Sequence, residues 1–257
     1  ILSLFIYYGA GFYVAYQILK IDYSCGLHEG SLPNTWSTSI DAHQYNDISQ
    51  KKLRENFQYE NYYLDEWQDV YFLSRDDDIK INGWLFNYFP NRPIVIVTHG
   101  INPNGKCKSE SNLIASLLVS KNFNVLTIDL RNYGQSDRYS KYEDLGLKSY
   151  KDILGAFDFL KKIGFKSSQI GLHGISLGAS TSIFAAYEEP EILAIWSDSP
   201  IAEFKMALTD EIARYGLSIE FGPAVSLAGR ILTGIDPTLL SPSLKLSKKQ
   251  AYFFTHG

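Results

Sequence analysis

A short apolar strand that runs into a Gly-x-Ser-x-Gly turn is the feature that most constrains this chain. Residues 169–178 read QIGLHGISLG, and four small residues follow at 179–182. The pattern is typical of a sharp strand-to-helix turn that holds a serine, here Ser176, at the N-terminus of a helix. A residue other than glycine at positive φ crowds its neighbours, so the positions two before and two after it must be small. Gly174 and Gly178 occupy those positions, whereas a glycine-rich turn without chemistry is the alternative at this point.

Apolar strands and helices alternate around this turn, and the alternation predicts an α/β fold. Continuous apolar runs at 94–98 and 123–128 are typical of strands buried on both faces. Before them, 70–73 and 79–85 read as two strands joined by a turn, which predicts an antiparallel hairpin. We therefore expect a mostly parallel sheet with helices on both faces. The other predicted elements are a strand at 192–196 and helices at 109–120, 149–162 and 177–187.

Polar residues stand at the ends of these strands, where ligands bind in sheets of this kind. His99, Asp129, Ser176 and Asp198 all lie at or just after the carboxyl end of a predicted strand. Because the carboxyl ends of parallel strands meet at one edge of a sheet, we expect a functional site at that edge.

Composition argues against several classes of function. The 257 residues carry a formal net charge of −4 and no basic stripe, so we expect no nucleic-acid partner. Cys25 and Cys107 lack the spacing of a metal site and make no disulfide framework. The acidic triplet at 76–78 is interpreted as a solvated turn, and His28 and His43 as solvated loop histidines. No metal and no cofactor are expected.

An uncharged apolar run opens the chain and predicts a membrane segment. Residues 1–19 contain no charged side chain, and about 20 apolar residues suffice to cross a bilayer as a helix. We expect 1–20 to be a transmembrane or signal-anchor helix, with a cleaved signal peptide or a buried helix as the alternatives. The protein is then membrane-anchored and single-pass, and the sequence does not indicate the side of the membrane.

The rest of the chain divides into a connector and one large domain. Residues 21–66 are expected to pack on the domain as a connector, with a helix at 47–63. Residues 67–257 form the α/β domain, in which 201–246 depart from the tight alternation of strands and helices. This insertion is interpreted as a lid or cap, or as helices that only cover the sheet. The helices expected in it are 202–215 and 222–232.

Several motifs make the chain resemble the α/β-hydrolase family, and within it the membrane-anchored, serine aminopeptidase-like (S33-like) branch of bacterial hydrolases. The resemblance covers residues 67–257 and depends on the order and spacing of the motifs. Asn132 departs from it, because relatives usually carry glycine there, but asparagine tolerates a left-handed turn. The motifs are SRDD at 74–77 with INGW at 81–84, VTHG at 97–100, DLR at 129–131 with YGQS at 133–136, GISLG at 174–178 and SDSP at 197–200.

The resemblance implies a role for each matched position. Ser176 is expected to be the nucleophile on a nucleophile elbow, and the N–H of Leu177 to form one half of an oxyanion hole. The other half is expected from the N–H of Ile101, in the loop that follows His99 and Gly100. His99 is then a structural loop residue and not a base.

The triad acid and base are expected outside this sequence. In this fold the chain order is serine, acid, histidine, and the one histidine after Ser176 is His256. His256 repeats the strand-end pattern of His99, so we interpret it as structural and expect both partners beyond Gly257. The chain is then a fragment that lacks the C-terminal strand and helix. Asp198 is the alternative acid, although a loop-ordering role is preferred for it.

Three hypotheses about function remain. The first is a serine hydrolase that cleaves an ester, thioester or amide of a small-molecule or acyl substrate through an acyl-enzyme on Ser176. The second is a non-catalytic binding or scaffold domain, and the third is an acyltransferase that uses the same elbow. The insertion at 201–246 carries no specificity motif, so neither the substrate nor the oligomeric state is predicted.

Overall fold

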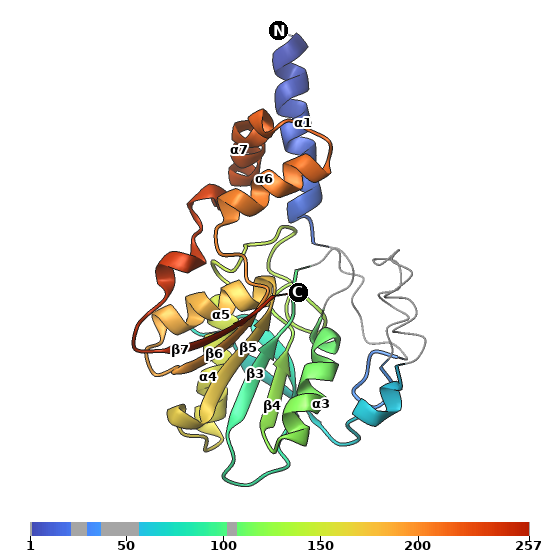
Figure 1. The fold of residues 1–257 in the computed structure, drawn as a ribbon, viewed down its shortest axis with the longest axis vertical. Helices are drawn as coiled ribbons and strands as arrows, with labels where there is room; N and C mark the ends of the chain where they lie inside the picture. The colour runs from blue at the N-terminus through green and yellow to red at the C-terminus, as the bar shows by residue number, and fades with distance from the viewer. Residues whose placement is uncertain (1, 22–29, 37–56, 102–106, 257) are drawn as a thin grey trace.

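Residues 2–21, 30–36, 57–101 and 107–256 are described by the computed structural model of this chain. Within them, seven strands form one sheet in the order β1-β2-β4-β3-β5-β6-β7 (Figure 1). β2 pairs antiparallel with both β1 and β4, and all the other neighbours run parallel. The predicted mostly parallel sheet with an N-terminal hairpin is confirmed. The strands are β1 (Gln68–Leu73), β2 (Lys80–Phe86), β3 (Ile94–Thr98), β4 (Asn124–Ile128), β5 (Ile170–Ile175), β6 (Ala194–Asp198) and β7 (Ala251–Thr255).

The helices that cover the sheet are α3 (Asn112–Ser120), α4 (Tyr150–Lys162) and α5 (Leu177–Glu188). Successive residues of a strand point to opposite faces, so each central strand supplies two hydrophobic layers. Ile94 and Ile96 of β3 pack in the layer that contains α4 and α5, whereas Val95 and Val97 pack in the layer with α3. Helices therefore cover both faces, as predicted (Figure 1).

Two predicted elements differ from the structure. The strand expected at 192–196 is β6, two residues later, and Ile192 is buried in the core before the strand begins. The sheet ladder decides this boundary, because Ala194 to Asp198 pair with Ala251 to Thr255 of β7. Of the helix expected at 47–63, the described part contains only a 3-10 helix, η2 (Tyr59–Tyr62). Outside the described residues lie 47–56, Cys25, His28 and His43.

Residues 201–246, here called the cap segment, pack against the N-terminal helix. α1 (Leu2–Leu19) runs alongside α7 (Gly222–Thr233) at one end of the molecule (Figure 1). Both helices contribute to one apolar cluster, which contains Val14 and Leu19 of α1 and Val225 of α7. The cap segment also contains α6 (Phe204–Arg214) and the 3-10 helices η5 (Ile219–Phe221), η6 (Pro237–Leu239) and η7 (Pro242–Lys245).

α1 has the length and composition of a helix that crosses a membrane. It has 18 residues with a mean hydropathy of 1.3, although a signal sequence or the core helix of a soluble protein meets the same criterion. Its C-terminal end is tied to the domain. Lys20 forms a β-bridge with Tyr142, and the carbonyl of Leu19 accepts the N–H of Glu143 at 2.8 Å. The end of α1 is therefore attached to the loop between β4 and α4.

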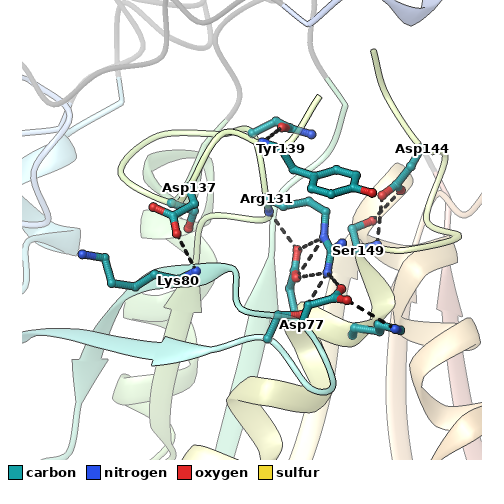
Figure 2. Close-up of polar contacts among 12 residues, drawn as sticks. Asp77, Lys80, Arg131, Asp137, Tyr139, Asp144 and Ser149 are labelled. Atoms are coloured by element: carbon teal, nitrogen blue, oxygen red, sulfur yellow. Dashed lines mark hydrogen bonds and ion pairs between the residues drawn. The ribbon is translucent and has the colours of Figure 1, made fainter. Parts of the chain in front are cut away.

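A buried arginine holds that same loop onto the domain. Arg131 follows β4 and is only 2% exposed. Its Nη2 donates to Asp152 of α4 at 2.7 Å, to Asp77 of the β1–β2 turn at 2.9 Å and to the Ser74 hydroxyl at 2.9 Å (Figure 2). Burial raises the pKa of Asp152 to about 6. Because that value is still below neutral pH, the carboxylate is ionised there. One guanidinium thus joins a hairpin turn, a loop and a helix.

Replacing Arg131 should destabilise the fold strongly. In Arg131→Ala the buried carboxylate of Asp152 loses its cation, which typically lowers the free energy of unfolding by about 3–5 kcal/mol. Lys161→Ala is the control, because Lys161 pairs with Glu191 in solvent and exposed pairs contribute little. Urea denaturation of both variants measures the difference. Equal, small effects would contradict the structural role given to Arg131.

Two neighbouring buried carboxyl groups also stand in this loop. Glu143 is 4% exposed, and burial together with Asp144 raises its pKa to about 7. Burial likewise raises the pKa of Asp144. The Tyr133 hydroxyl donates to Glu143 at 2.6 Å, and the N–H groups of Asp144 and Leu145 donate to its other oxygen. These donated hydrogen bonds favour the carboxylate, but burial and the neighbouring Asp144 outweigh them, so charge on Glu143 is disfavoured in the folded state.

The raised pKa makes the effect of Glu143→Gln dependent on pH. Because the folded pKa lies above the ordinary value, the stability that Glu143 contributes is complete below pH 4.5 and is lost as the pH rises through about 7. A glutamine at this position does not ionise, so the variant does not lose this stability as the pH rises. We expect the variant to gain about 2 kcal/mol relative to wild type between pH 5 and pH 8. Denaturant unfolding at the two pH values measures this gain, and an identical difference at both would be evidence against the raised pKa.

Candidate active site

The turn between β5 and α5 has the strained geometry that its sequence predicts. Ser176 adopts φ 52° and ψ −112° immediately before the first residue of α5. A Cβ on Gly174 would lie 2.3 Å from the carbonyl oxygen of Gly178, and one on Gly178 would lie 2.4 Å from the carbonyl oxygen of His99. Both glycines are therefore required by close backbone contacts, and the expectation that these positions must be small is confirmed.

Backbone hydrogen bonds hold Ser176 between two strands. Its N–H donates to the carbonyl of Asp198, at the end of β6, at 2.8 Å. Its own carbonyl accepts the N–H of Ser180 in the first turn of α5 at 3.1 Å. On the other side, a Cβ on Gly100 would lie 3.3 Å from the Cβ of Ser176, so the loop after β3 closely approaches the serine. The half-buried serine thus lies at the carboxyl edge of the sheet, where N–H groups at a helix N-terminus favour negative charge.

Two backbone N–H groups beside Ser176 lack an acceptor among the described residues. They belong to Leu177, the first residue of α5, and to Ile101, in the loop after β3. The N–H of Gly100, the residue before Ile101, already has an acceptor, because it donates to Glu110 Oε2 at 2.7 Å. These two donors are the pair that the resemblance to the α/β-hydrolase family implies for an oxyanion hole.

Neither described core histidine is suited to act as a base. Nε2 of His99 accepts the N–H of Leu130 at 3.1 Å, and Nδ1 donates to the carbonyl of Gly100 at 2.8 Å. Burial lowers the pKa of His99, which keeps this single neutral tautomer. The ring of His173 in β5 lies edge-on to the ring of Trp196, with the two ring centroids 4.3 Å apart, and burial lowers the pKa of His173 to about 4. His99 is thus a loop-holding residue, in agreement with the expectation.

Asp198 links the ends of two strands. Its Oδ1 accepts the hydroxyl of Thr255 at 3.0 Å and that of Ser199 at 3.4 Å. The N–H of Ser199 donates to the carbonyl of Thr255 at 2.7 Å. These bonds agree with the expected loop-ordering role of Asp198. His256 follows the last residue of β7 and is exposed, so it occupies the expected strand-end position.

A buried lysine near the site was not predicted. Lys108 is 1% exposed, and its Nζ donates to Asp129, Asn82 and Gln135. Its N–H also donates to Asp129 at 2.8 Å, so the carboxylate of Asp129 is fully engaged and has a structural role. The local sequence KCKSES carries no signal for burial. The preceding residue, Cys107, is disulfide-bonded, which the sequence did not predict either.

The side chains around the unengaged N–H groups are apolar. Leu177 belongs to the same hydrophobic cluster as Leu145 and the cap-segment residue Phe204, and Ile101 packs against that cluster. Val14, Ala15 and Leu19 of α1 are members as well. Within the described ranges, no group of three or more His, Cys, Asp or Glu residues is arranged to hold a metal ion.

Substitution of the two glycines of β5 should separate the tight turn from an ordinary strand position. Gly174→Ala places a Cβ against the Gly178 carbonyl and should lower the free energy of unfolding by about 1–3 kcal/mol. In Gly171→Ala the new Cβ lies 3.5 Å from the carbonyl oxygen of Ala194, which is an ordinary contact, so this variant should be neutral or stabilising. Thermal unfolding of both variants tests this. If the two melt alike, the close contact at Gly174 does not constrain the turn.

Comparisons with known proteins agree with this fold. Residues 93–218 match the family model described as alpha/beta hydrolase fold. Thiohydrolase aneE from Aspergillus aculeatus is 32% identical over 139 residues, which are 53% of this chain and 42% of that protein. Acyltransferase drtE from Aspergillus calidoustus is 27% identical over 136 residues, 52% of this chain and 43% of that protein. The match thus spans less than half the length of either relative.

Solved structures show the same fold at low sequence identity. The esterase Pf2001 from Pyrococcus furiosus superposes with a TM-score of 0.53 and 21% identity over 74% of this chain and 69% of that chain. An acylaminoacyl peptidase from Pyrococcus horikoshii has a TM-score of 0.52 and 19% identity over 82% of this chain and 34% of that chain. The seven-stranded sheet, the matched family model and these superpositions agree. The chain therefore has the α/β-hydrolase fold.

Proposed function

We propose that this protein is a serine hydrolase of the serine aminopeptidase-like branch, which forms an acyl-enzyme on Ser176. The observation that carries the proposal is the φ of 52° at Ser176, at the start of α5 and beside two unengaged N–H groups. Strain of this kind persists only where the surroundings enforce it. Ser199 has the same φ, so it is the position of Ser176 at the N-terminus of α5, next to these N–H groups, that distinguishes it.

The proposed reaction proceeds in two steps. The Ser176 oxygen attacks the carbonyl carbon of the substrate, and the N–H groups of Leu177 and Ile101 stabilise the oxyanion that develops. The intermediate collapses to an acyl-serine when the alcohol, thiol or amine leaves with a proton. Water then attacks the acyl-serine and releases the acid. Each oxyanion donor of this kind contributes about 3–4 kcal/mol to transition-state stabilisation.

The proton of Ser176 must pass to a base that an acid orients. His99 is engaged with backbone groups, and His173 faces Trp196, so neither serves as the base in this proposal. The chain order of the fold assigns the acid and the base to positions C-terminal to β7. We propose that these partners follow Gly257 and that His256 is structural.

The names of the two relatives suggest the class of substrate. One is called a thiohydrolase and the other an acyltransferase. The apolar cluster around Leu177 and Ile101 also suits an acyl group. We therefore favour an ester or thioester substrate, with acyl transfer as the second candidate. The two differ only in whether water or another nucleophile attacks the acyl-serine.

We also propose that α1 attaches the domain to a membrane. Its uncharged sequence and its 18-residue length support this. Cys107 is disulfide-bonded, and disulfides persist mainly in oxidising compartments. The domain is therefore proposed to face the oxidising side of that membrane.

A fluorophosphonate probe tests the nucleophile in the full-length protein. We expect covalent labelling of wild type and background labelling of Ser176→Ala, because the probe reacts with a serine that is activated and beside an oxyanion hole. Ser199→Ala is the matched control, since Ser199 also has φ 52° and lies at the end of the neighbouring strand. Gel fluorescence and mass spectrometry of the labelled peptide give the readout.

The outcomes of that experiment separate the hypotheses. Undiminished labelling of Ser176→Ala would show that Ser176 is not the nucleophile. No labelling of wild type would favour a non-catalytic binding domain. His256→Ala is expected to label as well as wild type, whereas a loss would assign the base to His256.

A further inference from the structure

The N–H of Ile101 belongs to the same peptide unit as the carbonyl of Gly100. A peptide unit is planar, and in its usual trans form the C=O and N–H groups point in opposite directions. Nδ1 of His99 donates to the Gly100 carbonyl at 2.8 Å, so this hydrogen bond also sets the direction of the Ile101 N–H. Gly100 has no side chain that restricts rotation of this peptide unit. The orientation of the proposed oxyanion donor therefore depends on the imidazole of His99.

Tyr133 sets the orientation of that imidazole. The rings of His99 and Tyr133 lie edge to face, with their centroids 4.7 Å apart, and both residues are buried. Nε2 of His99 accepts the N–H of Leu130 at 3.1 Å, and the N–H of Tyr133 donates to the carbonyl of the same Leu130 at 3.0 Å. The imidazole is thus packed against Tyr133 and bonded to the turn that contains it. A shift of Tyr133 would therefore be transmitted to His99.

Glu143 binds the hydroxyl end of Tyr133. The Tyr133 hydroxyl donates to Oε2 of Glu143 at 2.6 Å, and Oε1 accepts the N–H groups of Asp144 at 3.0 Å and Leu145 at 3.3 Å. Leu145 has a φ of 55°, which is strained for leucine, so the carboxyl group also supports an unfavourable turn. Glu143 thereby connects Tyr133 to a turn whose Leu145 side chain packs in the same apolar cluster as Leu177.

A carboxyl group is costly at the position of Glu143. Burial and the neighbouring Asp144 raise the pKa of Glu143 to about 7, while the positive charge of Arg131 acts on Asp144. Burial by itself would favour a hydrocarbon side chain here, but a hydrocarbon cannot accept the Tyr133 hydroxyl. Buried groups with shifted pKa values cluster at functional sites. The cost therefore points to a role for the bond between Glu143 and Tyr133.

We propose that Glu143 is a positioning residue, which acts through Tyr133 and His99 to aim the N–H of Ile101 at the oxyanion. The proposal rests on the oxyanion hole proposed above, and it adds the residues that hold one of its two donors. When these contacts are interrupted, the Gly100–Ile101 peptide unit is free to rotate and the oxyanion loses a donor. Such a loss slows the chemical step and leaves binding unchanged, because the oxyanion forms only after the serine has attacked.

Histidine NMR tests the positioning without any need for catalysis. The full-length protein is prepared with isotope-labelled histidine, and the signals of His99 are assigned by their loss in His99→Gln. In wild type we expect the neutral tautomer with the proton on Nδ1, which exchanges slowly with water because it is buried and hydrogen-bonded. Glu143→Ala and Tyr133→Phe should each speed the exchange of this proton about tenfold or more, because both remove the bond that holds Tyr133.

The rate of fluorophosphonate labelling tests the consequence for Ser176. In Glu143→Ala and Tyr133→Phe we expect the maximal labelling rate to fall about tenfold or more, because an oxyanion donor is lost. The probe concentration that gives half of this rate should change less than about twofold. Glu143→Gln should restore both the labelling rate and the slow exchange of the His99 proton, because a glutamine amide can bond to the Tyr133 hydroxyl.

Asp144→Ala is the matched control. Asp144 is also a buried carboxyl group of this loop, but it accepts the N–H of Gly146 and the hydroxyl of Ser149 and does not bind Tyr133. The variant should lower the melting temperature, because it removes these bonds, and it should leave the exchange of the His99 proton and the labelling rate unchanged.

The outcomes separate a positioning role from a merely structural one. Equal losses in Asp144→Ala and Glu143→Ala would overturn the proposal, because general loosening of the loop would then explain both. An unchanged His99 proton in Glu143→Ala and Tyr133→Phe would also overturn it. A wild type that does not label would contradict the serine hydrolase, whereas the NMR measurements would still decide whether Glu143 positions His99.

Discussion

The contact between two backbone turns at Ser176 is the constraint on which the rest of the site depends. Gly178 lies against the carbonyl of His99, and Gly174 lies against the carbonyl of Gly178, at distances that admit no side chain. This contact brings the loop after β3 onto the first turn of α5. Ser176 and the N–H groups of Leu177 and Ile101 consequently lie at one edge of the sheet.

Buried polar residues hold the loops that meet at this edge. His99 binds backbone groups of two loops, Lys108 binds Asp129, and Arg131 joins a hairpin turn to α4. Each of these groups is costly to bury alone and is retained because its partners satisfy it. The loops after β3 and β4 are thereby held in one arrangement, which is what a preorganised site requires.

Local sequence patterns made much of the fold predictable, whereas the contacts between residues far apart in the sequence could not be predicted. Apolar runs such as 94–98 and the glycines around Ser176 report on geometry within a few residues, so strands, helices and the tight turn follow from them. Lys108 gives no such signal, because its three acceptors come from distant positions in the sequence. The packing of α1 onto α7 was missed for the same reason, since the two helices are about 200 residues apart.

The sequence by itself determined the strand–helix alternation, the elbow around Ser176 and the apolar character of residues 2–19. These features follow from periodicity and from the conformational freedom of glycine, which act locally. Only the tertiary structure decided that Asp198 orders two strand ends, that His99 is committed to the backbone, and that the N-terminal helix packs with the cap segment. Those outcomes depend on which distant atoms meet, and burial makes each meeting selective because an unpartnered polar group or an exposed apolar face is costly.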